Sequence, residues 1–386
     1  MQKSSEIAST INKKAILELL REKGPMSKAD ITRELHLSFP AVSYNVKKLQ
    51  EENLIYEMGM ADNVLGRKGV LLAFNSRLSY LIGVDIGRNN IRVMCSDIGG
   101  KILAYSTKRI EQNNDVIQQV IQQVYSIVEE VKIEIADVIC MGIGVPGIYD
   151  GQTDCLKFAP FAETWNKQLL MQNLKKEFCM DIVIENSVNL GAIGERWQGV
   201  AKGYKNILYV DLGVGIGSAA IIDGVLMRGK NGAFGEIAYM LLDKDRLSDR
   251  FSEEGSLEKL IPSRAIGQLI TQLYQGDEKL PIREVLNRLE KSGDFPEIQN
   301  VPLYFSMSLV NTIAVTNPDL LVIAGRLGCA LYQSYKKEME ALIEANVPFP
   351  PTIKCTKLSE KASVYGAIAT ALLHVNDSYA DYHKFR

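Results

Sequence analysis

The sequence predicts an α/β protein with two related lobes, preceded by a small α+β winged helix-turn-helix domain. Three observations indicate this: an aspartate–glycine hairpin that occurs twice, three short helices before its first copy, and a basic hairpin tip after the third helix. The predicted limits are 1–76 for the N-terminal domain, 77–194 for the first lobe and 195–386 for the second lobe. An alternative for the C-terminal helix is that it packs on the first lobe.

Composition and charge limit the classes of protein to which the chain can belong. With 386 residues, 46% of them hydrophobic and 23% charged, the chain suits a globular protein of two or three domains. Neither a membrane span nor a signal peptide is expected, because no apolar run approaches about twenty residues and the start is polar. Six scattered cysteines without a Cys-x-x-Cys pair fit a reducing cytoplasm. A net charge of +3 over residues 1–78, against −5 over the rest, permits nucleic-acid binding by the first segment.

Helical periodicity and capping residues predict three helices near the N-terminus. The first helix ends at Gly24-Pro25, and its expected buried residues are Ile11, Ala15, Ile16, Leu19 and Leu20. Ser27 is expected to cap a second helix over 28–35, and Ser38 a third. The third helix should bury a stripe formed by Val42, Val46 and Leu49.

The remaining face of the third helix is typical of a recognition helix. Small and hydrogen-bonding residues come first and cations follow, as for a helix whose early residues reach base edges and whose later ones touch phosphate. The residues expected to bind DNA on this helix are Ser38, Pro40, Ala41, Ser43, Tyr44, Asn45, Lys47 and Lys48. Two predicted strands, 54–57 and 70–74, flank a tip containing Arg67 and Lys68, which predicts a wing. The alternative is a small helical interaction domain with a solvated charged face.

This segment resembles the winged-helix module that precedes the kinase-like part of ROK-family (repressor, ORF, kinase) regulators. Residues 42–49 and 65–69 carry the resemblance. The family usually has Gly-Arg-Pro at the wing, and Lys68 takes the proline position here. The resemblance implies that operator DNA is a partner.

The duplicated hairpin organises the rest of the chain. An apolar strand runs into Asp85 in the first copy and into Asp211 in the second, 126 residues later. In each copy another aspartate follows after twelve positions, at Asp97 and Asp223, and glycine follows closely. Facing hairpins in duplicated lobes resemble the actin-like (ribonuclease H-like) sugar kinase superfamily, which implies a two-lobed fold around a cleft.

Glycines at alternating positions allow a backbone to approach a phosphate closely. The residues of these nucleotide-loop remnants are Asp85, Gly87, Asp211, Gly213, Gly215 and Gly217. Two interpretations compete for the second loop: residual nucleotide binding, or glycine required by tight packing of the hairpin. We favour packing, because glycine serves such bends without a ligand. In the first loop Arg88 and Asn89 replace a glycine and a threonine typical of active kinases.

From Leu81 onward nearly the whole chain resembles ROK proteins. The segments that carry the resemblance are 142–147, 185–189, 232–239, 255–258 and 317–325. It implies a sugar site in the cleft made by Asn186, Ser187, Glu236, Tyr239 and Glu258. Amide and carboxylate groups suit hydroxyls, which both donate and accept hydrogen bonds. The alternative is that these are ordinary surface or capping residues.

Departures from the family pattern argue against catalysis. Ser187 stands where the resemblance places the catalytic aspartate, and a serine hydroxyl does not hold a proton-accepting charge near neutral pH. The family's zinc cysteines fall at Asp249, Phe251 and Ser256, and its histidine at Tyr239. A structural zinc normally needs four Cys or His ligands. We therefore predict no enzyme activity, no metal and no cofactor.

The sequence favours a sugar-responsive transcriptional regulator, most simply a repressor of carbohydrate-utilisation genes. Its expected partners are operator DNA, a sugar or sugar-derivative effector, and a second copy of the chain in a homodimer or higher homo-oligomer. Closure of the cleft would change the spacing of two winged helices. The rival is an active, ATP-dependent ROK-type sugar kinase with an accessory DNA-binding domain. A third, less favoured reading is a scaffold whose winged helix binds protein.

Overall fold

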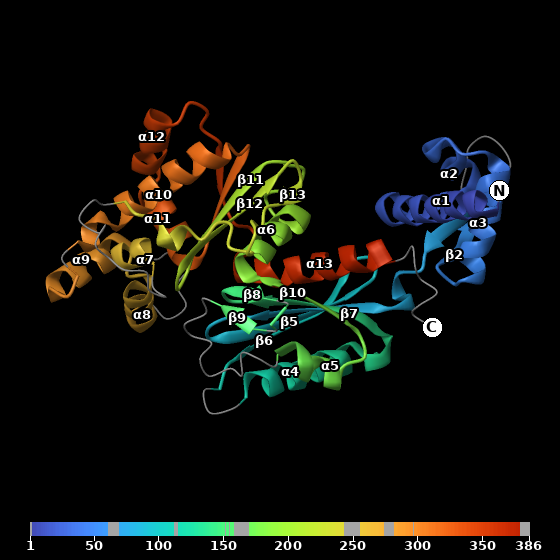
Figure 1. Ribbon diagram of the computed structural model, residues 1–386, viewed down its shortest axis with the longest axis horizontal. Coiled ribbons are helices and arrows are strands. Elements are labelled where there is room, and N and C mark those ends of the chain that lie inside the picture. The colour runs from blue at the N-terminus through green and yellow to red at the C-terminus, as the bar shows by residue number, and fades with distance from the viewer. Residues whose placement is uncertain are drawn as a thin grey trace.

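The computed structural model describes residues 2–60, 69–111, 115–150, 152–153, 155–157, 170–242, 255–273, 282–295 and 297–378. Figure 1 shows a small N-terminal module beside two sheet-containing lobes. Within the described residues, no helix is long and apolar enough to cross a bilayer.

The N-terminal module contains three helices and a three-stranded sheet of order β1-β3-β2. Its elements are α1 (Gln2–Lys23), β1 (Met26–Ser27), α2 (Lys28–Leu35), α3 (Phe39–Glu51), β2 (Ile55–Met60) and β3 (Val70–Phe74). Ser27 and Asp30 form a reciprocal capping box that begins α2, and Ser38 caps α3 through the amide of Ala41. The predicted helices and the two flanking strands are therefore confirmed, while the short strand β1 was not predicted.

The core of this module contains most of the residues that periodicity predicted. Its buried side chains include Ile16, Leu19, Leu20, Val42, Val46 and Leu49. Two predicted residues are exceptions: Ala15 is only half-buried, and 63% of the surface of Ile11 is exposed on α1. The prediction that Ile11 faces the core is wrong: Ile11 lies five residues before Ile16, on another side of the helix, whereas Ser9, seven residues before Ile16, shares the packed side and contacts Asn45.

The first lobe is built on a five-stranded sheet of order β10-β7-β4-β5-β6. Its strands are β4 (Tyr80–Ile86), β5 (Asn90–Asp97), β6 (Ile102–Arg109), β7 (Val138–Val145) and β10 (Asp181–Asn186). On one face the sheet packs against α4 (Val116–Val131) and α5 (Leu170–Glu177), and on the other against α13 (Ala362–Ser378). A small ribbon of β8 (Ile148–Asp150) and β9 (Cys155–Lys157) extends beside it.

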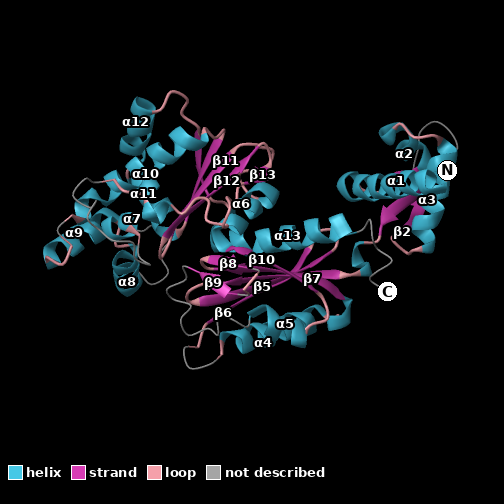
Figure 2. Cartoon of the chain, viewed as in Figure 1, coloured by secondary structure: helices cyan, strands magenta, loops and turns pink. Residues whose placement is uncertain are grey.

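The second lobe has a five-stranded sheet of order β13-β12-β11-β14-β15. Its strands are β11 (Ile207–Leu212), β12 (Ile216–Ile222), β13 (Val225–Leu226), β14 (Leu320–Ala324) and β15 (Thr352–Cys355). Its helices are α6 (Ser187–Gln198), α7 (Ser256–Leu260), α8 (Ser263–Leu273), α9 (Ile282–Ser292), α10 (Val301–Thr316), α11 (Arg326–Ser334) and α12 (Lys336–Asn346). Figure 2 shows that helices surround this sheet.

The two sheets share one topology, which confirms the predicted duplication. Strand β4 pairs antiparallel with β5 and parallel with β7. In the same way β11 pairs antiparallel with β12 and parallel with β14. Asp85 lies near the end of β4 and Asp211 near the end of β11, so each aspartate begins its hairpin turn at the same place in its lobe.

The lobes meet where α6 crosses α13. Helix α6 packs on the second sheet through Val188 and Ala192, and α13 packs on the first sheet. Glycines bring the two helix backbones together: a Cβ added to Gly366 would lie 1.9 Å from the carbonyl oxygen of Leu190, and one added to Gly194 would lie 2.0 Å from that of Ala362. The predicted boundary between residues 194 and 195 falls inside α6, and the domain limits remain a prediction.

The N-terminal module is joined to the first lobe by shared apolar packing. Phe74, at the end of β3, and Leu78, in the following 3-10 turn, contact the core of the N-terminal module. Both also contact the cluster formed by α13 and the first sheet. The two cores are therefore continuous through these side chains.

Candidate DNA-binding face and effector cavity

The exposed side of α3 carries most of the residues predicted to bind DNA. Tyr44 is 58% exposed, and the unpredicted neighbour Phe39 is 53% exposed. Pro40 and Lys47 are also exposed, while Ala41, Ser43 and Lys48 are partly so. Lys48 lies 3.2 Å from Glu51 and Lys47 lies 4.0 Å from it, pairs that exposure keeps weak. These cations therefore remain able to exchange partners with a phosphate.

Asn45 does not belong to this face, and the prediction that it is exposed is wrong. Its side chain is 2% exposed. Nδ2 donates to the carbonyl oxygen of Ala41 at 2.8 Å, and Oδ1 accepts from the hydroxyl of Ser9 on α1 at 2.7 Å. Position 45 is three residues after Val42 and four before Leu49, so helical spacing places it on the buried side. This spacing was the feature of the sequence from which the burial of Asn45 could have been predicted.

The predicted wing is described only at its two strands. Strands β2 and β3 pair antiparallel, and β1 adds to the free side of β3. Arg67 and Lys68, predicted to contact phosphate, lie outside the described residues, and their role stays a prediction.

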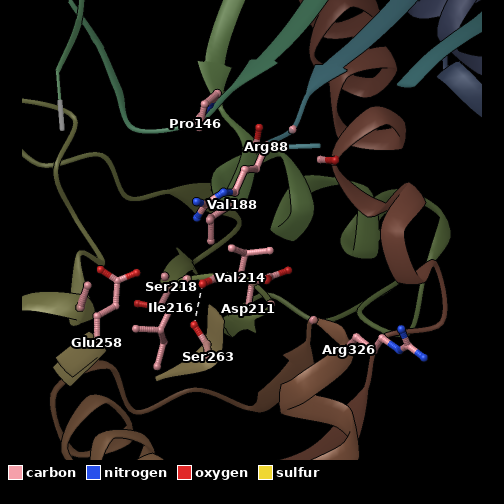
Figure 3. A pocket seen from close by; sticks show the side chains of 18 of the residues that line it. Arg88, Pro146, Val188, Asp211, Val214, Ile216, Ser218, Glu258, Ser263 and Arg326 are labelled. Atoms are coloured by element: carbon pink, nitrogen blue, oxygen red, sulfur yellow. Dashed lines mark hydrogen bonds between the residues drawn. The ribbon is translucent and has the colours of Figure 1, made fainter. Parts of the chain in front are cut away.

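One cavity of about 1160 Å³ lies between the lobes. It is lined by all the predicted sugar-binding and nucleotide-loop residues, namely Asp85, Gly87, Asn186, Ser187, Asp211, Gly213, Gly215, Gly217, Glu236, Tyr239 and Glu258. Figure 3 shows side chains from both lobes converging on it. The structure therefore brings together residues that lie up to 173 positions apart in the chain.

Ser187 lies at the beginning of α6 and faces Asp85 across the cavity floor. Its hydroxyl donates to Oδ1 of Asp85 at 2.8 Å. The other oxygen of Asp85 accepts from Nη1 of Arg92 at 3.1 Å, and Arg92 also contacts Glu360 at 3.2 Å. Both carboxylate oxygens of Asp85 thus already have protein partners. The hydroxyl of Ser187 presents only its lone pairs to a ligand, so it is suited to accept a hydrogen bond.

Asn186 caps α6, as the alternative interpretation expected of a polar residue there. Its Oδ1 accepts from the amides of Val188 at 2.7 Å and Asn189 at 3.2 Å. Its Nδ2 donates to the carbonyl oxygen of Gly147 at 2.8 Å, which ties the turn after β7 to α6. An amide nitrogen carries two protons, so one donor position of Asn186 is left for a ligand.

Two carboxylic acids lie together at another part of the cavity. Burial, followed by the nearby charge of Glu258, raises the pKa of Glu236 above its ordinary value. Carboxyl oxygens accept hydrogen bonds from the hydroxyls of a sugar.

The glycine hairpin of the second lobe is packed closely against protein atoms. A Cβ on Gly215 would lie 2.6 Å from Oε1 of Glu258, and one on Gly217 would lie 3.1 Å from Cγ2 of Val188. Ser263 donates from its hydroxyl to the carbonyl oxygen of Val214 (Figure 3). The carboxylate of Glu258 ends a flexible side chain that can move aside, so these contacts do not by themselves require glycine; they place a carboxylate beside the tip of the hairpin. The packing interpretation of this loop stays a prediction.

Asp211 lies at the start of this hairpin, where it is half-buried and lines the cavity. Burial raises its pKa to about 6, while a weak hydrogen bond from the Tyr209 hydroxyl, at 3.4 Å, partly offsets that effect. The charge of Asp85 adds to the increase in the pKa.

The structure describes only two of the four positions on which the prediction of no zinc rests. Asp249 and Phe251 lie outside them. Ser256 is buried at the beginning of α7, and Tyr239 lines the cavity. Within the described part of the chain, no group of three or more Cys, His, Asp or Glu side chains is arranged to hold a metal ion.

Comparison with known proteins identifies both parts of the chain. A winged helix-turn-helix DNA-binding model matches residues 10–56. A xylose repressor of Bacillus subtilis (strain 168) is 28% identical over 317 residues, covering 81% of each chain. The transcriptional dual regulator NagC of Escherichia coli (strain K12) is 22% identical over 335 residues, covering 83% of this chain and 82% of its own.

Solved structures support the fold. The crystal structure of a ROK family transcriptional regulator, a homologue of the E. coli MLC protein, matches with a TM-score of 0.70 at 20% identity and covers 97% of both chains. A ROK hexokinase from Thermus thermophilus matches with a TM-score of 0.62 at 22% identity, covering 77% of this chain and 99% of its own. The ROK family model matches residues 81–373, and the protein therefore belongs to the ROK family.

Proposed function

We propose that the protein is a sugar-responsive, DNA-binding transcriptional repressor whose kinase-like part senses an effector and does not transfer phosphate. The observation that carries this proposal is the hydrogen bond from Ser187 to Asp85 at the place where a sugar kinase needs a base. Phosphoryl transfer to a hydroxyl requires a group that accepts the hydroxyl proton. Ser187 is neutral, and Asp85 is engaged by Ser187 and Arg92.

Two features support the DNA-binding half of the proposal. The described face of α3 carries Tyr44, Lys47 and partly exposed Ser43, a set suited to base edges and phosphates. Relatives named as a xylose repressor and a putative xylose repressor align with 81% and 94% of the chain. We further propose that a homodimer presents two winged helices to two half-sites, since such modules bind in pairs about 34–36 Å apart.

The effector in this proposal is a sugar or sugar derivative bound in the cavity between the lobes. Glu236, Glu258 and Tyr239 line the second-lobe side, and Asn186 and Ser187 the floor. An effector that contacts both sides changes the equilibrium between lobe arrangements by its differential affinity for them.

The rival function is an active sugar kinase with an accessory DNA-binding domain. The observation in its favour is that Asp85, Asp211 and the glycine hairpin share one cavity. A coupled assay for ATP turnover with hexoses, pentoses and N-acetylated sugars discriminates between the two. Sugar-dependent turnover by the unmodified protein would refute the proposal.

DNA binding is tested separately. Binding sites are first selected from random DNA with the purified protein, and fluorescence anisotropy then measures affinity with each sugar present. A specific site whose affinity changes with one sugar is the expected result. Absence of any preferred DNA site would overturn the repressor assignment. Elemental analysis of the same preparation tests the proposal that no zinc is bound, which about one zinc per chain would contradict.

A further inference from the structure

One segment of the second lobe reaches across to the first lobe beside the effector cavity. We call residues 227–236, which follow β13, the interlobe strap. One end is held by the second sheet, since the amide of Met227 donates to the carbonyl oxygen of Ala220 at 2.9 Å. At the other end, the amide and the hydroxyl of Ser218 both donate to the carbonyl oxygen of Gly235 at 2.9 Å. The interlobe strap is therefore part of the second lobe.

Between these ends, the interlobe strap contacts the first lobe at two places. Nε of Arg228 donates to Oε2 of Glu185, on β10, at 2.8 Å. A Cβ built on Gly232 would lie 3.4 Å from Cγ2 of Ile148, on β8. Strands β13 and β10 belong to different lobes (Figure 1). The ion pair between Arg228 and Glu185 therefore joins the two lobes directly.

The interlobe strap also forms part of the cavity wall. Four of its residues line the cavity, namely Gly232, Phe234, Gly235 and Glu236. The amide of Phe234 donates to the carbonyl oxygen of Arg228 at 3.1 Å, so the ion-paired residue and the cavity wall belong to one folded loop. Neither Arg228 nor Glu185 is among the described residues that line the cavity. The ion pair can thus act on the cavity through the interlobe strap without touching a ligand.

Glu185 is held in place by partners other than Arg228. Its Oε1 accepts from the amide of Asn186 at 3.0 Å and from Nδ2 of Asn189 at 2.9 Å. The side chain of Glu185 is 14% exposed, and that of Arg228 is 53% exposed. Exposed ion pairs are usually weak because both side chains must be ordered, whereas here the carboxylate is already fixed. The pair therefore links the interlobe strap to the start of α6, where Asn186 lies.

We propose that Arg228 is a positioning residue for the effector: through Glu185 it holds the interlobe strap, and Glu236 with it, at the distance from Asn186 that a bound sugar requires. This inference rests on the proposed function of the cavity as the effector site. Glu236 belongs to the interlobe strap, and Asn186 follows Glu185 directly in the chain. When the ion pair is lost, the arrangement in which Glu236 and Asn186 reach the same ligand becomes less populated. The apparent affinity for that ligand then falls by the same fraction.

The test uses the full-length protein without DNA and four variants. Arg228→Gln and Glu185→Gln each remove the charge of one partner, and Glu185→Gln keeps an amide oxygen for Asn186 and Asn189. Arg228→Lys keeps the positive charge. Arg288→Gln is the matched control, because it breaks an exposed ion pair with Glu284 inside the single helix α9.

Hydrogen–deuterium exchange first measures the interlobe strap in the ligand-free protein. We expect residues 227–236 to exchange about tenfold faster in Arg228→Gln and Glu185→Gln than in wild type, and at the wild-type rate in Arg288→Gln. Unchanged exchange in both glutamine variants of the pair would overturn the proposal, because the interlobe strap would then be held without the ion pair.

Calorimetry then measures binding of hexoses, pentoses and N-acetylated sugars at a temperature where every variant is folded. The sugar that binds wild type should bind at least about fivefold more weakly to Arg228→Gln and to Glu185→Gln, and no more weakly to the double variant than to either one. Arg228→Lys should recover most of the affinity, and Arg288→Gln should match wild type. A side chain that only stabilises the fold would lower the melting temperature and leave the affinity unchanged. Wild-type affinity in both glutamine variants of the pair, or effects that add in the double variant, would refute the positioning role.

The outcome is separable from that of the proposed function. If a sugar alters DNA affinity in wild type and equally in Arg228→Gln and Glu185→Gln, the repressor proposal stands and the positioning role of Arg228 is refuted. If no sugar binds wild type while exchange of the interlobe strap still depends on the ion pair, the sugar-sensing role is refuted and the ion pair stands as the contact that joins the lobes.

Discussion

The hydroxyl of Ser187 donates a hydrogen bond of 2.8 Å to Oδ1 of Asp85, joining the start of α6 to the end of β4 across 102 residues of chain. Serine suits this position because it gives Asp85 a donor without adding charge. A carboxylate at position 187 would face a second carboxylate at hydrogen-bonding distance.

Ser187→Asp should therefore destabilise the protein and should not create a kinase. Like charges about 3 Å apart strongly raise the pKa of one carboxyl group, so the loss of stability grows as the pH rises. We expect a loss of at least about 1 kcal/mol at pH 8 and less at pH 5. Thermal unfolding at both pH values and an ATP-turnover assay measure this. Ser187→Asn is the neutral control, and turnover by the aspartate variant would contradict the expectation.

Glu236→Ala should abolish the response of DNA binding to sugar while leaving sugar-free DNA affinity intact. Glu236 lies in the interlobe cavity and belongs to an element remote from α3. Its loss removes sugar contacts and therefore the coupling between the two sites. Anisotropy titrations with and without sugar give both quantities. Glu344→Ala, an exposed change on α12, is the control, and an unchanged sugar response in Glu236→Ala would exclude this role.

Asp211→Asn should stabilise the folded protein above about pH 6. The pKa of Asp211 is raised from 3.8 to about 6, so the folded state binds its proton more tightly than the unfolded state does. Stability from this group is therefore present at low pH and is lost as the pH rises from about 4 to about 6. The gain in the variant is at most about 3 kcal/mol at pH 7.5 and disappears below pH 4. Denaturant unfolding across this pH range measures the change in the free energy of unfolding. A variant less stable than the wild type at pH 7.5 would contradict the prediction.

Asn45→Ala and Tyr44→Ala should separate stability from DNA recognition on one helix. Asn45 is buried and hydrogen-bonded to Ala41 and Ser9, so its truncation should cost about 1–3 kcal/mol. Tyr44 is 58% exposed, so its truncation should alter stability by no more than about 0.5 kcal/mol and should weaken discrimination between DNA sequences. Urea unfolding and competition with random DNA measure the two effects. If Asn45→Ala weakened DNA discrimination and Tyr44→Ala lowered stability, Asn45 would have to be assigned to the DNA-binding face.

Gly366→Ala should cost about 2 kcal/mol or more, because its methyl group would lie 1.9 Å from the carbonyl oxygen of Leu190. Gly267→Ala, on α8, is a matched control since a Cβ there meets nothing within 4 Å. It should stabilise the protein by about 0.5–1 kcal/mol. Thermal and denaturant unfolding compare the two variants. Equal effects would show that α6 and α13 separate easily.

The sequence predicted features whose signals are local. Ser27 and Ser38 each precede a helix and cap it, as their residue types indicate. The duplicated aspartate–glycine hairpins also predicted two sheets of one topology, since each hairpin is a short continuous segment.

Features that depend on distant partners could not be predicted in this way. Strand β1 has two residues and exists only because β3 pairs with it. Ile11 lies four residues before Ala15, a helical spacing, yet it is 63% exposed because it lies on another side of α1 from Ile16. The carboxylate of Glu258 beside Gly215 joins segments that no local pattern connects. The membership of the cavity was expected from resemblance, whereas the hydrogen bonds within it required the fold.

The apolar contacts of Phe74 and Leu78 have a mechanical consequence. Because both side chains pack into the N-terminal module and into the first lobe, we expect these two parts to move together. The second lobe contacts the first lobe where α6 crosses α13. It is then the part that moves relative to the N-terminal module and the first lobe. An effector that turns the second lobe leaves each recognition helix fixed on its own first lobe. In the proposed homodimer, a change in DNA affinity would then act through the way the two chains are held together, and a monomeric form of the protein should bind a half-site equally well with and without effector.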